Sequence, residues 1–383
     1  MPSLAAHVTA LQPNLIREIT EAAWARAASG QRTLILSIGE PAFEVPAHIR
    51  QAGIDCLLRD ETDYTPNGGL PALQEAFAAR LARDQGVDAD SGRIVVTAGA
   101  QQGLHLAMTL LLAPGDEILI PNPGYPTFGM TAELLGAVPV GYPLRAEHGF
   151  QPQTADLAAL ITPRTRVLLL NSPSNPLGAV LSAELTRGLV ELAREHDLWV
   201  ISDECYEAFS FDLPHVSPVQ FDSDGRVLVC WTASKTYSMT GLRIGAVLTP
   251  PGVGKPVSMA VESTFSCVST PAQYAALAAL TGPQDSVVTA RSHYRANRDA
   301  AEALLRARGL RFLDAQGAFY LWVEVSHVSA GDVQAWVHGF LASDGVALAP
   351  GTAFGSQGEG WVRIALCGDT AELLEGVARI PAP

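Results

Sequence analysis

The chain has 383 residues, of which 48% are hydrophobic, so it can bury a large core and is long enough for about two domains. The 39 acidic and 25 basic residues give a net charge of −14, which excludes nonspecific binding to nucleic acid or to an anionic membrane surface. The longest apolar runs are of strand length, and the N-terminal segment has no basic stretch followed by an apolar one. We therefore expect neither a membrane span nor a secretion signal.

The cysteines are far apart and form neither a CxxC pair nor a metal-binding spacing with histidine. They are Cys56, Cys205, Cys230, Cys267 and Cys367. We expect reduced thiols, no metal site and a cytoplasmic protein.

Short β-rich runs alternate along the chain with longer helical stretches. Strands are predicted at residues 93–97, 117–120, 166–170, 198–202, 227–231 and 244–248. Runs such as VLLL and LWVI are apolar at every position, which is typical of strands covered by helices on both faces. This βαβ repetition predicts an α/β fold with a mainly parallel sheet.

The C-terminal part of the chain has a different pattern. A basic helical segment, ARSHYRANRDAAEALLRARG, leads into the strand-like GAFYLWVEV, a further helix and then WVRIALC. We predict a smaller α+β domain at residues 286–383, joined by the N-terminal segment 1–38, and a large domain at residues 39–285.

Polar and small residues follow directly after several of the predicted strands. In an open α/β sheet, ligands bind at this edge. The first strand ends in TAGAQ (97–101) and then a helix, so backbone N–H groups there can approach a phosphate, although such turns usually have only a structural role. Asp203 follows the buried run LWVIS, and a buried carboxylate needs a cationic or hydrogen-bonding partner or serves as a helix cap.

A lysine and an arginine follow the next strand. Thr232, Ser234 and Lys235 come directly after VLVCW, and Arg243 lies eight residues beyond the lysine. A Schiff-base lysine needs an amine whose pKa can be lowered, and a phosphate binds an arginine through two hydrogen bonds. The segment therefore indicates that Lys235 holds a phosphate-containing cofactor covalently, in preference to being an ordinary exposed lysine.

Six motifs occur together in one order: SIGEP, NPGYPTF, NSPSNPLG, SDECY, SKTYSMTGLRIG and WVRIAL. With these motifs the chain resembles the class I/II aminotransferases that depend on pyridoxal phosphate, of the aspartate aminotransferase type. The resemblance runs from about residue 37 to about residue 363. It implies PLP fold type I, with a mainly parallel seven-stranded sheet between helices in the large domain.

The resemblance assigns residues to the cofactor. Lys235 is the Schiff-base lysine, and Arg243 binds the phosphate with the hydroxyls of Thr232 and Ser234, the former standing where the family often has serine. Asp203 pairs with the protonated pyridine nitrogen. The remaining cofactor contacts are Asn175 and Tyr206 on the phenolic oxygen, Tyr125 stacked on the ring, and the helix N-terminus at Gly99, Ala100 and Gln101 on the phosphate.

The resemblance also assigns the substrate site and a partner subunit. Arg363 takes the substrate α-carboxylate, helped by Asn175 and the backbone at Gly39. Tyr64 in DYTPNGG reaches the phosphate of the neighbouring subunit, so a homodimer with shared active sites is expected.

The implied reaction moves an amino group between an L-amino acid and a 2-oxo acid by a ping-pong mechanism. A carbon–sulfur β-lyase on the same fold is the alternative, and a noncatalytic regulator is disfavoured because no DNA-binding segment precedes the fold. Gln101 stands where a dicarboxylate-binding lysine occurs in one related branch, so a neutral donor ranks narrowly above aspartate. Five aromatic residues are candidates for an apolar pocket, although core positions are expected for most: Phe43, Phe128, Tyr237, Phe265 and Phe354.

Overall fold

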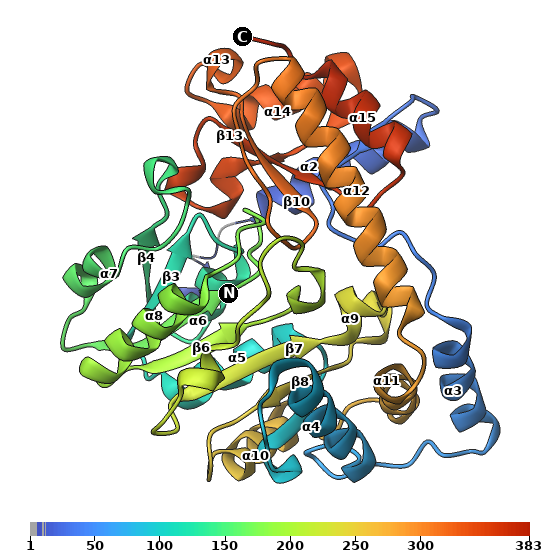
Figure 1. The fold of residues 1–383 in the computed structure, drawn as a ribbon, viewed down its shortest axis with the longest axis vertical. Coiled ribbons are helices and arrows are strands. Elements are labelled where there is room, and N and C mark those ends of the chain that lie inside the picture. Colours follow the sequence, from blue (N-terminus) through green and yellow to red (C-terminus); the bar gives the residue numbers. More distant parts are fainter. Residues whose placement is uncertain (1–5, 10, 12) are drawn as a thin grey trace, which may run out of the picture.

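The computed structural model describes residues 6–9, 11 and 13–383, and Figure 1 shows their arrangement. Strands β3, β6 and β7 lie in the lower part of the view, the red C-terminal elements lie above them, and the orange helix α12 runs down along the right-hand side. Part of the N-terminal segment in which no secretion signal was recognised falls outside the described residues.

The larger sheet has seven strands in the order β2-β8-β7-β6-β5-β3-β4. Their bounds are β2 Ile94–Thr97, β3 Glu117–Asn122, β4 Val138–Pro143, β5 Thr165–Asn171, β6 Trp199–Asp203, β7 Val227–Thr232 and β8 Gly245–Leu248. Strand β8 is antiparallel to both of its neighbours, and the other pairs are parallel. The carboxyl ends of β2, β3, β5, β6 and β7 therefore lie along one edge of the sheet.

The six predicted strands are confirmed, with ends that differ by one or two residues. The sequence prediction missed β4, because VPVGYP contains two prolines and a glycine and has the composition of a turn. Strand β4 is at the edge of the sheet and, within the described part of the chain, pairs with β3 alone; an edge strand tolerates proline.

Helices cover both faces of this sheet, as the apolar strands predicted. In β5, Leu168 and Leu170 belong to one buried apolar cluster, whereas Val167 and Leu169 belong to another. Successive side chains of a strand point to opposite faces, so the two clusters are the cores on the two sides. The helices are α3 Ala47–Leu58, α4 Pro71–Gln85, α5 Ala100–Leu111, α6 Thr127–Leu134, α7 Thr154–Leu160, α8 Ala183–Glu195, α9 Ala233–Thr236, α10 Gly254–Thr264 and α11 Thr270–Thr281.

The C-terminal elements form a second, antiparallel sheet in the order β12-β13-β10-β9. Its strands are β9 Phe312–Leu313, β10 Tyr320–Glu324, β12 Ala349–Pro350 and β13 Trp361–Ala365, and its helices are α12 Asp285–Ala307, α13 Ser326–Ser329, α14 Val333–Asp344 and α15 Thr370–Arg379. The α/β class and the smaller α+β unit are thus confirmed.

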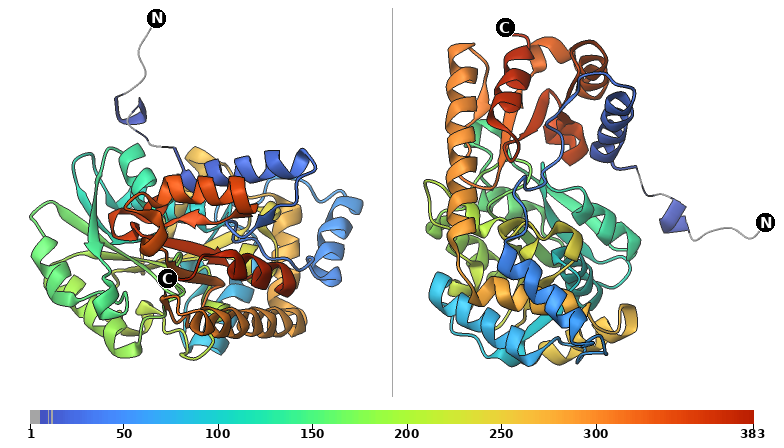
Figure 2. Two further views of the ribbon diagram at one scale, coloured as in Figure 1. Left: turned by 90° about the horizontal axis from the view of Figure 1, so that it is seen from above. Right: turned by 90° about the vertical axis from the view of Figure 1, so that its right-hand side faces the viewer.

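The N-terminal segment lies against the C-terminal elements. Strand β1, Leu34–Ile35, pairs with β11, Val346–Ala347, and helix α2, Leu15–Ala28, packs against α14, β11 and β12. Figure 2 shows α2, in blue, beside the red C-terminal elements. We propose on this arrangement that the predicted segment 1–38 joins the small domain mainly through α2 and β1, with boundaries at residues 38 and 285. Helix α1, Ala6–Thr9, instead contacts α6 of the large domain, and residues 1–5, 10 and 12 lie outside the described residues.

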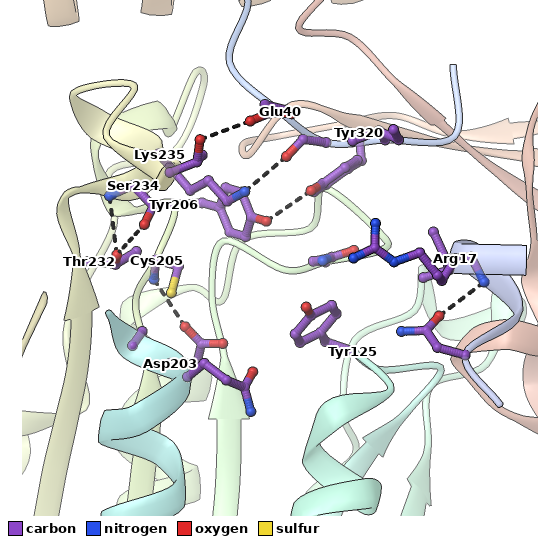
Figure 3. A pocket seen from close by; sticks show the side chains of 18 of the residues that line it. Arg17, Glu40, Tyr125, Asp203, Cys205, Tyr206, Thr232, Ser234, Lys235 and Tyr320 are labelled. Carbon is purple, nitrogen blue, oxygen red and sulfur yellow. Dashed lines mark hydrogen bonds between the residues drawn. The ribbon is translucent and has the colours of Figure 1, made fainter. Parts of the chain in front are cut away.

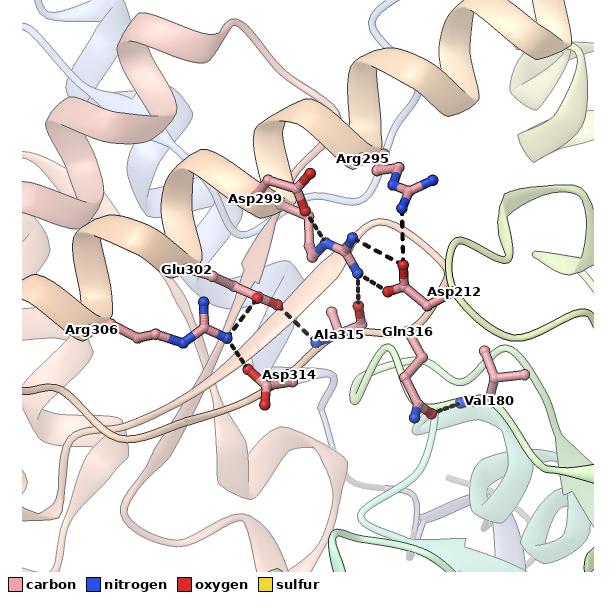
Figure 4. Close-up of polar contacts among 10 residues, drawn as sticks. Val180, Asp212, Arg295, Asp299, Glu302, Arg306, Asp314, Ala315 and Gln316 are labelled. Carbon is pink, nitrogen blue, oxygen red and sulfur yellow. Dashed lines mark hydrogen bonds and ion pairs between the residues drawn. The ribbon is translucent and has the colours of Figure 1, made fainter.

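A polar network holds the segment before β10 against the large domain (Figure 4). Arg298 of α12 donates to the Ala315 carbonyl at 2.6 Å and forms an ion pair with Asp212. Gln316 accepts a hydrogen bond from the backbone N–H of Val180 at 3.1 Å. Strand β10 is therefore fixed relative to the loop that follows β5.

The five cysteines are free thiols. Within the described ranges, no helix is long and apolar enough to cross a membrane, and no cluster of three metal-binding side chains occurs.

Candidate active site

A cavity of about 440 Å³ lies at the carboxyl edge of the large sheet, between that sheet, helix α2 and strands β10 and β13. Figure 3 shows the side chains that line it. The residues that the sequence predicted and that line the cavity are Gly39, Ala100, Gln101, Tyr125, Asn175, Asp203, Tyr206, Thr232, Ser234, Lys235, Arg243 and Arg363. Residues from the six motifs and from the TAGAQ turn thus converge on one site.

Lys235 lies in the short helix α9, directly after β7, and its amine points into the cavity. The amine donates a hydrogen bond to the Gly39 carbonyl at 2.9 Å. Burial lowers the pKa of Lys235, because a charged ammonium loses hydration there. The amine is therefore more easily deprotonated than an exposed lysine.

Asp203 ends β6 and is 4% exposed. Its carboxylate accepts a hydrogen bond from the Cys205 N–H at 3.1 Å, and among the described residues no cation lies within ion-pair distance of it. Burial raises the pKa of Asp203 to about 6. A cationic group placed in the cavity would reverse this shift.

A cluster of donors surrounds the N-terminus of α5. Gly99 caps the helix with φ +78°, and a side chain there would begin 2.6 Å from Nη2 of Arg243. Thr232 Oγ1 donates to Ser234 Oγ at 2.8 Å, and the exposed Arg243 donates to the Thr240 carbonyl at 2.8 Å. Hydroxyls, a helix N-terminus and a guanidinium without an acidic partner in the described part of the chain suit a phosphate group.

Arg363 of β13 is a buried cation, 3% exposed. It donates from Nη1 to Asn175 Oδ1 at 2.8 Å and from Nη2 to the Ser37 carbonyl, and its Nε has no hydrogen-bond partner among the residues that the structure describes. These acceptors are neutral, and within the described residues the guanidinium forms no ion pair. A buried arginine in this state is suited to a carboxylate ligand.

Three tyrosines line the cavity. Tyr206 and Tyr320 hold their hydroxyl oxygens 2.9 Å apart, and Tyr125 packs edge-on against Phe128 with ring centroids 5.8 Å apart. Burial raises the pKa of each hydroxyl, that of Tyr320 to about 12. All three are therefore neutral at physiological pH.

Several residues that line the cavity were not predicted from the sequence. Tyr320 lies in GAFYLWVEV, which was recognised only as a strand, and Arg17 and Trp24 lie on α2, which carried no motif. In the view of Figure 3, Arg17 and Lys235 lie on opposite sides of the cavity. An arginine in the first turn of a helix gives no sequence signal of its own, because only the packing of α2 places it over the cavity.

Some of the predicted residues lie elsewhere. Tyr64 is 89% exposed and does not line the cavity of its own chain, and Gly99 lies just behind the cavity wall, against Arg243. The five aromatic residues considered for an apolar pocket do not line the cavity: Phe128, Tyr237 and Phe354 are in the core, Phe43 packs against His293, and Phe265 is half exposed.

The family model described as aminotransferase class I and II matches residues 32–380. The chain belongs to this family.

Relatives and solved structures agree with this assignment. The aminotransferase is 37% identical over 388 residues to a probable aspartate/prephenate aminotransferase of Aquifex aeolicus, covering 98% of this chain and 97% of the relative. It is 38% identical to an arginine–pyruvate transaminase of Pseudomonas aeruginosa, covering 94% and 91%. The structure of an aspartate aminotransferase mutant of Thermus thermophilus matches with a TM-score of 0.94 at 33% identity, covering all of both chains.

This aminotransferase therefore moves an amino group between an L-amino acid and a 2-oxo acid, with pyridoxal phosphate as cofactor. The relatives reported above are named as aminotransferases, so the β-lyase alternative has no support. The cavity fits the cofactor: the donors around Gly99 and Arg243 suit its phosphate, and the buried Asp203, which lacks a cation in the described protein, suits its protonated ring nitrogen.

Proposed function

We propose that Lys235, Asp203 and Arg363 carry the reaction of this aminotransferase. Lys235 holds the cofactor and moves the proton, Asp203 pairs with the ring nitrogen, and Arg363 binds the substrate α-carboxylate. The observation that carries the proposal is that a buried arginine, whose partners among the described residues are neutral, opens on the same cavity as a half-buried lysine of lowered pKa. Together they provide an anion-binding point and a base.

When bound, pyridoxal phosphate supplies an electron-accepting ring that stores the charge left on the substrate Cα. Asp203 stabilises that charge, because its carboxylate keeps the ring nitrogen protonated. Tyr206 and Asn175 would donate to the phenolic oxygen of the bound cofactor, Tyr125 would pack on its ring, and Arg243 with the neighbouring hydroxyls would bind its phosphate. The phosphate-binding set is Gly99, Ala100, Gln101, Thr232, Ser234 and Arg243.

Lys235 acts as the general base once the substrate has freed its amine. The lowered pKa leaves a larger share of the amine neutral, so that the amine can take the proton from the substrate Cα. In the second half of the reaction the same group can deliver a proton to the Cα of the amino acid that forms. The Gly39 carbonyl, 2.9 Å from the amine, orients it. Arg363 and Asn175 fix the α-carboxylate, which sets the position of the Cα proton relative to the amine.

Arg17 favours a donor with an anionic side chain, in contrast to the neutral donor ranked first from the sequence. Its side chain is 64% exposed, and its contact with Glu21, at 3.7 Å, is longer than a hydrogen bond. Gln101 is engaged with Thr127, at 2.9 Å, and with Thr131. Arg17 is thus better placed than Gln101 to bind a distal carboxylate, although Glu40, which also lines the cavity, would oppose one.

The same proposal includes a cytoplasmic homodimer with shared active sites. Leu57 and Leu58 at the end of α3 are exposed, Leu58 to 78%, and Tyr64 follows shortly after them with its hydroxyl outside its own cavity. Exposed apolar side chains are suited to contact with a second copy of this chain, and in such a dimer the Tyr64 hydroxyl can reach the phosphate site of the partner. The free cysteines are consistent with a reducing compartment.

The test is half-reaction spectroscopy on the cofactor-loaded protein with a panel of acidic, aromatic and aliphatic L-amino acids. Each accepted donor should convert the absorption band of the bound cofactor to that of its amine form, with release of a 2-oxo acid. Lys235→Ala is the control and should lose the covalent attachment seen by mass spectrometry after borohydride reduction. A loaded wild-type protein that shows no conversion with any donor would contradict the proposed roles.

A further inference from the structure

Tyr320 lies between the parts of the site that bind the cofactor and the substrate. It begins strand β10, is 2% exposed and lines the cavity. Its hydroxyl lies 2.9 Å from that of Tyr206, and its ring lies under the guanidinium of Arg363, with Cζ 4.3 Å from the ring centroid. Neither the motifs nor the roles proposed above include this residue.

We propose that Tyr320 is a positioning residue that aims the Tyr206 hydroxyl at the phenolic oxygen of the cofactor and holds Arg363 for the substrate carboxylate. The inference rests on the roles proposed above for Tyr206 and Arg363. It adds that a single side chain couples the two.

The hydroxyl of Tyr320 acts on Tyr206. Each hydroxyl has one proton, and burial raises both pKa values, so neither group ionises near neutral pH. When Tyr320 donates to Tyr206, the proton of Tyr206 is left free to donate into the cavity. Among the described residues, Tyr320 is the hydrogen-bond partner of the Tyr206 hydroxyl.

The ring of Tyr320 acts on Arg363. In the sheet, Arg363 on β13 pairs with Trp322 on β10, so Tyr320 is its diagonal neighbour. The ring of Phe354 lies 4.9 Å from the same guanidinium. A guanidinium held against aromatic faces keeps its planar fork in one orientation, and this contact is strongest away from water.

The hydroxyl of Tyr320 also abuts the segment that orients Lys235. A side chain at Gly39 would begin 1.9 Å from the Tyr320 hydroxyl oxygen, so any larger residue there would displace Tyr320. The carbonyl of the same Gly39 accepts the hydrogen bond from the Lys235 amine. Tyr320 therefore contacts one neighbour from each part of the site. Gly39 orients the base, Arg363 belongs to the carboxylate site and Tyr206 to the cofactor site.

Two substitutions separate the two actions. Tyr320→Phe removes the hydroxyl and keeps the ring, whereas Tyr320→Leu removes both. The readouts are the pH at which the visible band of the bound cofactor titrates, and KM and kcat for one donor. Tyr320→Phe should move this titration to higher pH by about one unit and leave KM within about twofold of the wild-type value. The reason is that Tyr206 becomes a weaker donor, so more negative charge stays on the phenolic oxygen and the bound cofactor holds its proton more tightly. Tyr320→Leu should show the same shift and also raise KM about tenfold.

Tyr142→Phe is the matched control. Tyr142 is also buried and donates to the Leu169 carbonyl at 3.0 Å, but it does not line the cavity, so its variant should titrate as the wild type does. Tyr206→Phe is the reference for the full effect. If Tyr206→Phe leaves the titration unchanged, the proposed role of Tyr206 fails. If Tyr206→Phe shifts it and Tyr320→Phe matches Tyr142→Phe, the inference alone is overturned. Circular dichroism and cofactor content establish that each variant is folded and loaded.

Discussion

Replacing Asp203 by asparagine is expected to raise the free energy of unfolding of the cofactor-free protein at neutral pH. The same substitution should reduce the further stabilisation that bound cofactor provides. Burial raises the pKa of Asp203 from 3.8 to about 6. Above that pH the folded apoprotein holds a buried carboxylate without an ion pair in the described residues. At 1.36 kcal/mol per pKa unit, the cost is at most about 3 kcal/mol.

The sign follows from proton binding. Because the folded-state pKa is raised, the folded apoprotein binds more protons than the unfolded chain between about pH 4 and pH 6, and its stability falls as pH rises through this range. Asparagine stays neutral, so the variant should lack this fall. Its amide oxygen can still accept the hydrogen bond from the Cys205 N–H, so little else changes.

The assay is urea unfolding of the two apoproteins at equal concentration, followed by circular dichroism at about pH 7.5 and at about pH 4.5. The variant should be more stable by up to about 3 kcal/mol at the higher pH and closer to the wild type at the lower pH. Added pyridoxal phosphate should stabilise the wild type more than the variant, whose kcat should fall by about 10² or more.

Glu204→Gln is a control at the neighbouring buried carboxylate. Burial alone would raise the pKa of Glu204, but the charge and hydrogen bond of His215 and the hydroxyls of Ser217 and Ser202 lower it. This substitution should therefore destabilise the apoprotein. An Asp203→Asn apoprotein no more stable than the wild type at about pH 7.5 would refute the view that Asp203 lacks a cation until the cofactor binds.

The remaining predictions concern the substrate and the partner subunit. Arg363→Lys should raise KM for any donor by about 10- to 100-fold in steady-state assays, since lysine cannot form the paired hydrogen bonds; an unchanged KM would place the α-carboxylate elsewhere. Arg17→Gln should raise KM for aspartate and glutamate by about tenfold and leave that for phenylalanine unchanged, and equal effects on both would rule out a distal-carboxylate contact. Lys235→Ala and Tyr64→Ala chains, each impaired alone, should regain about a quarter of the wild-type activity when unfolded and refolded together, because half of the dimers then contain one intact site. No recovery would argue against shared sites.

Much of the fold could be predicted because local pattern and tertiary environment agree. The runs VLLL and LWVI are apolar throughout, and in the structure both faces of these strands are covered. Strand β4 was missed because its turn-like composition is tolerated only through its place at the sheet edge, which the local sequence does not reveal.

The sequence by itself determined the cofactor chemistry. Asp203 and Lys235 lie at the ends of two parallel strands, and Arg243 lies eight residues beyond Lys235, just before β8. Because the ends of parallel strands meet at one edge, the order of the motifs was enough to bring these residues together. Only the tertiary structure decided which further side chains close the cavity on the side opposite the large sheet. Arg363 and Asn175 were expected together from their motifs and are hydrogen-bonded across 188 positions, whereas Tyr320 and Arg17 reach the cavity only through the packing of β10 and α2. Such contacts depend on how two packed units are oriented, and the periodicity of a single segment carries no information about that.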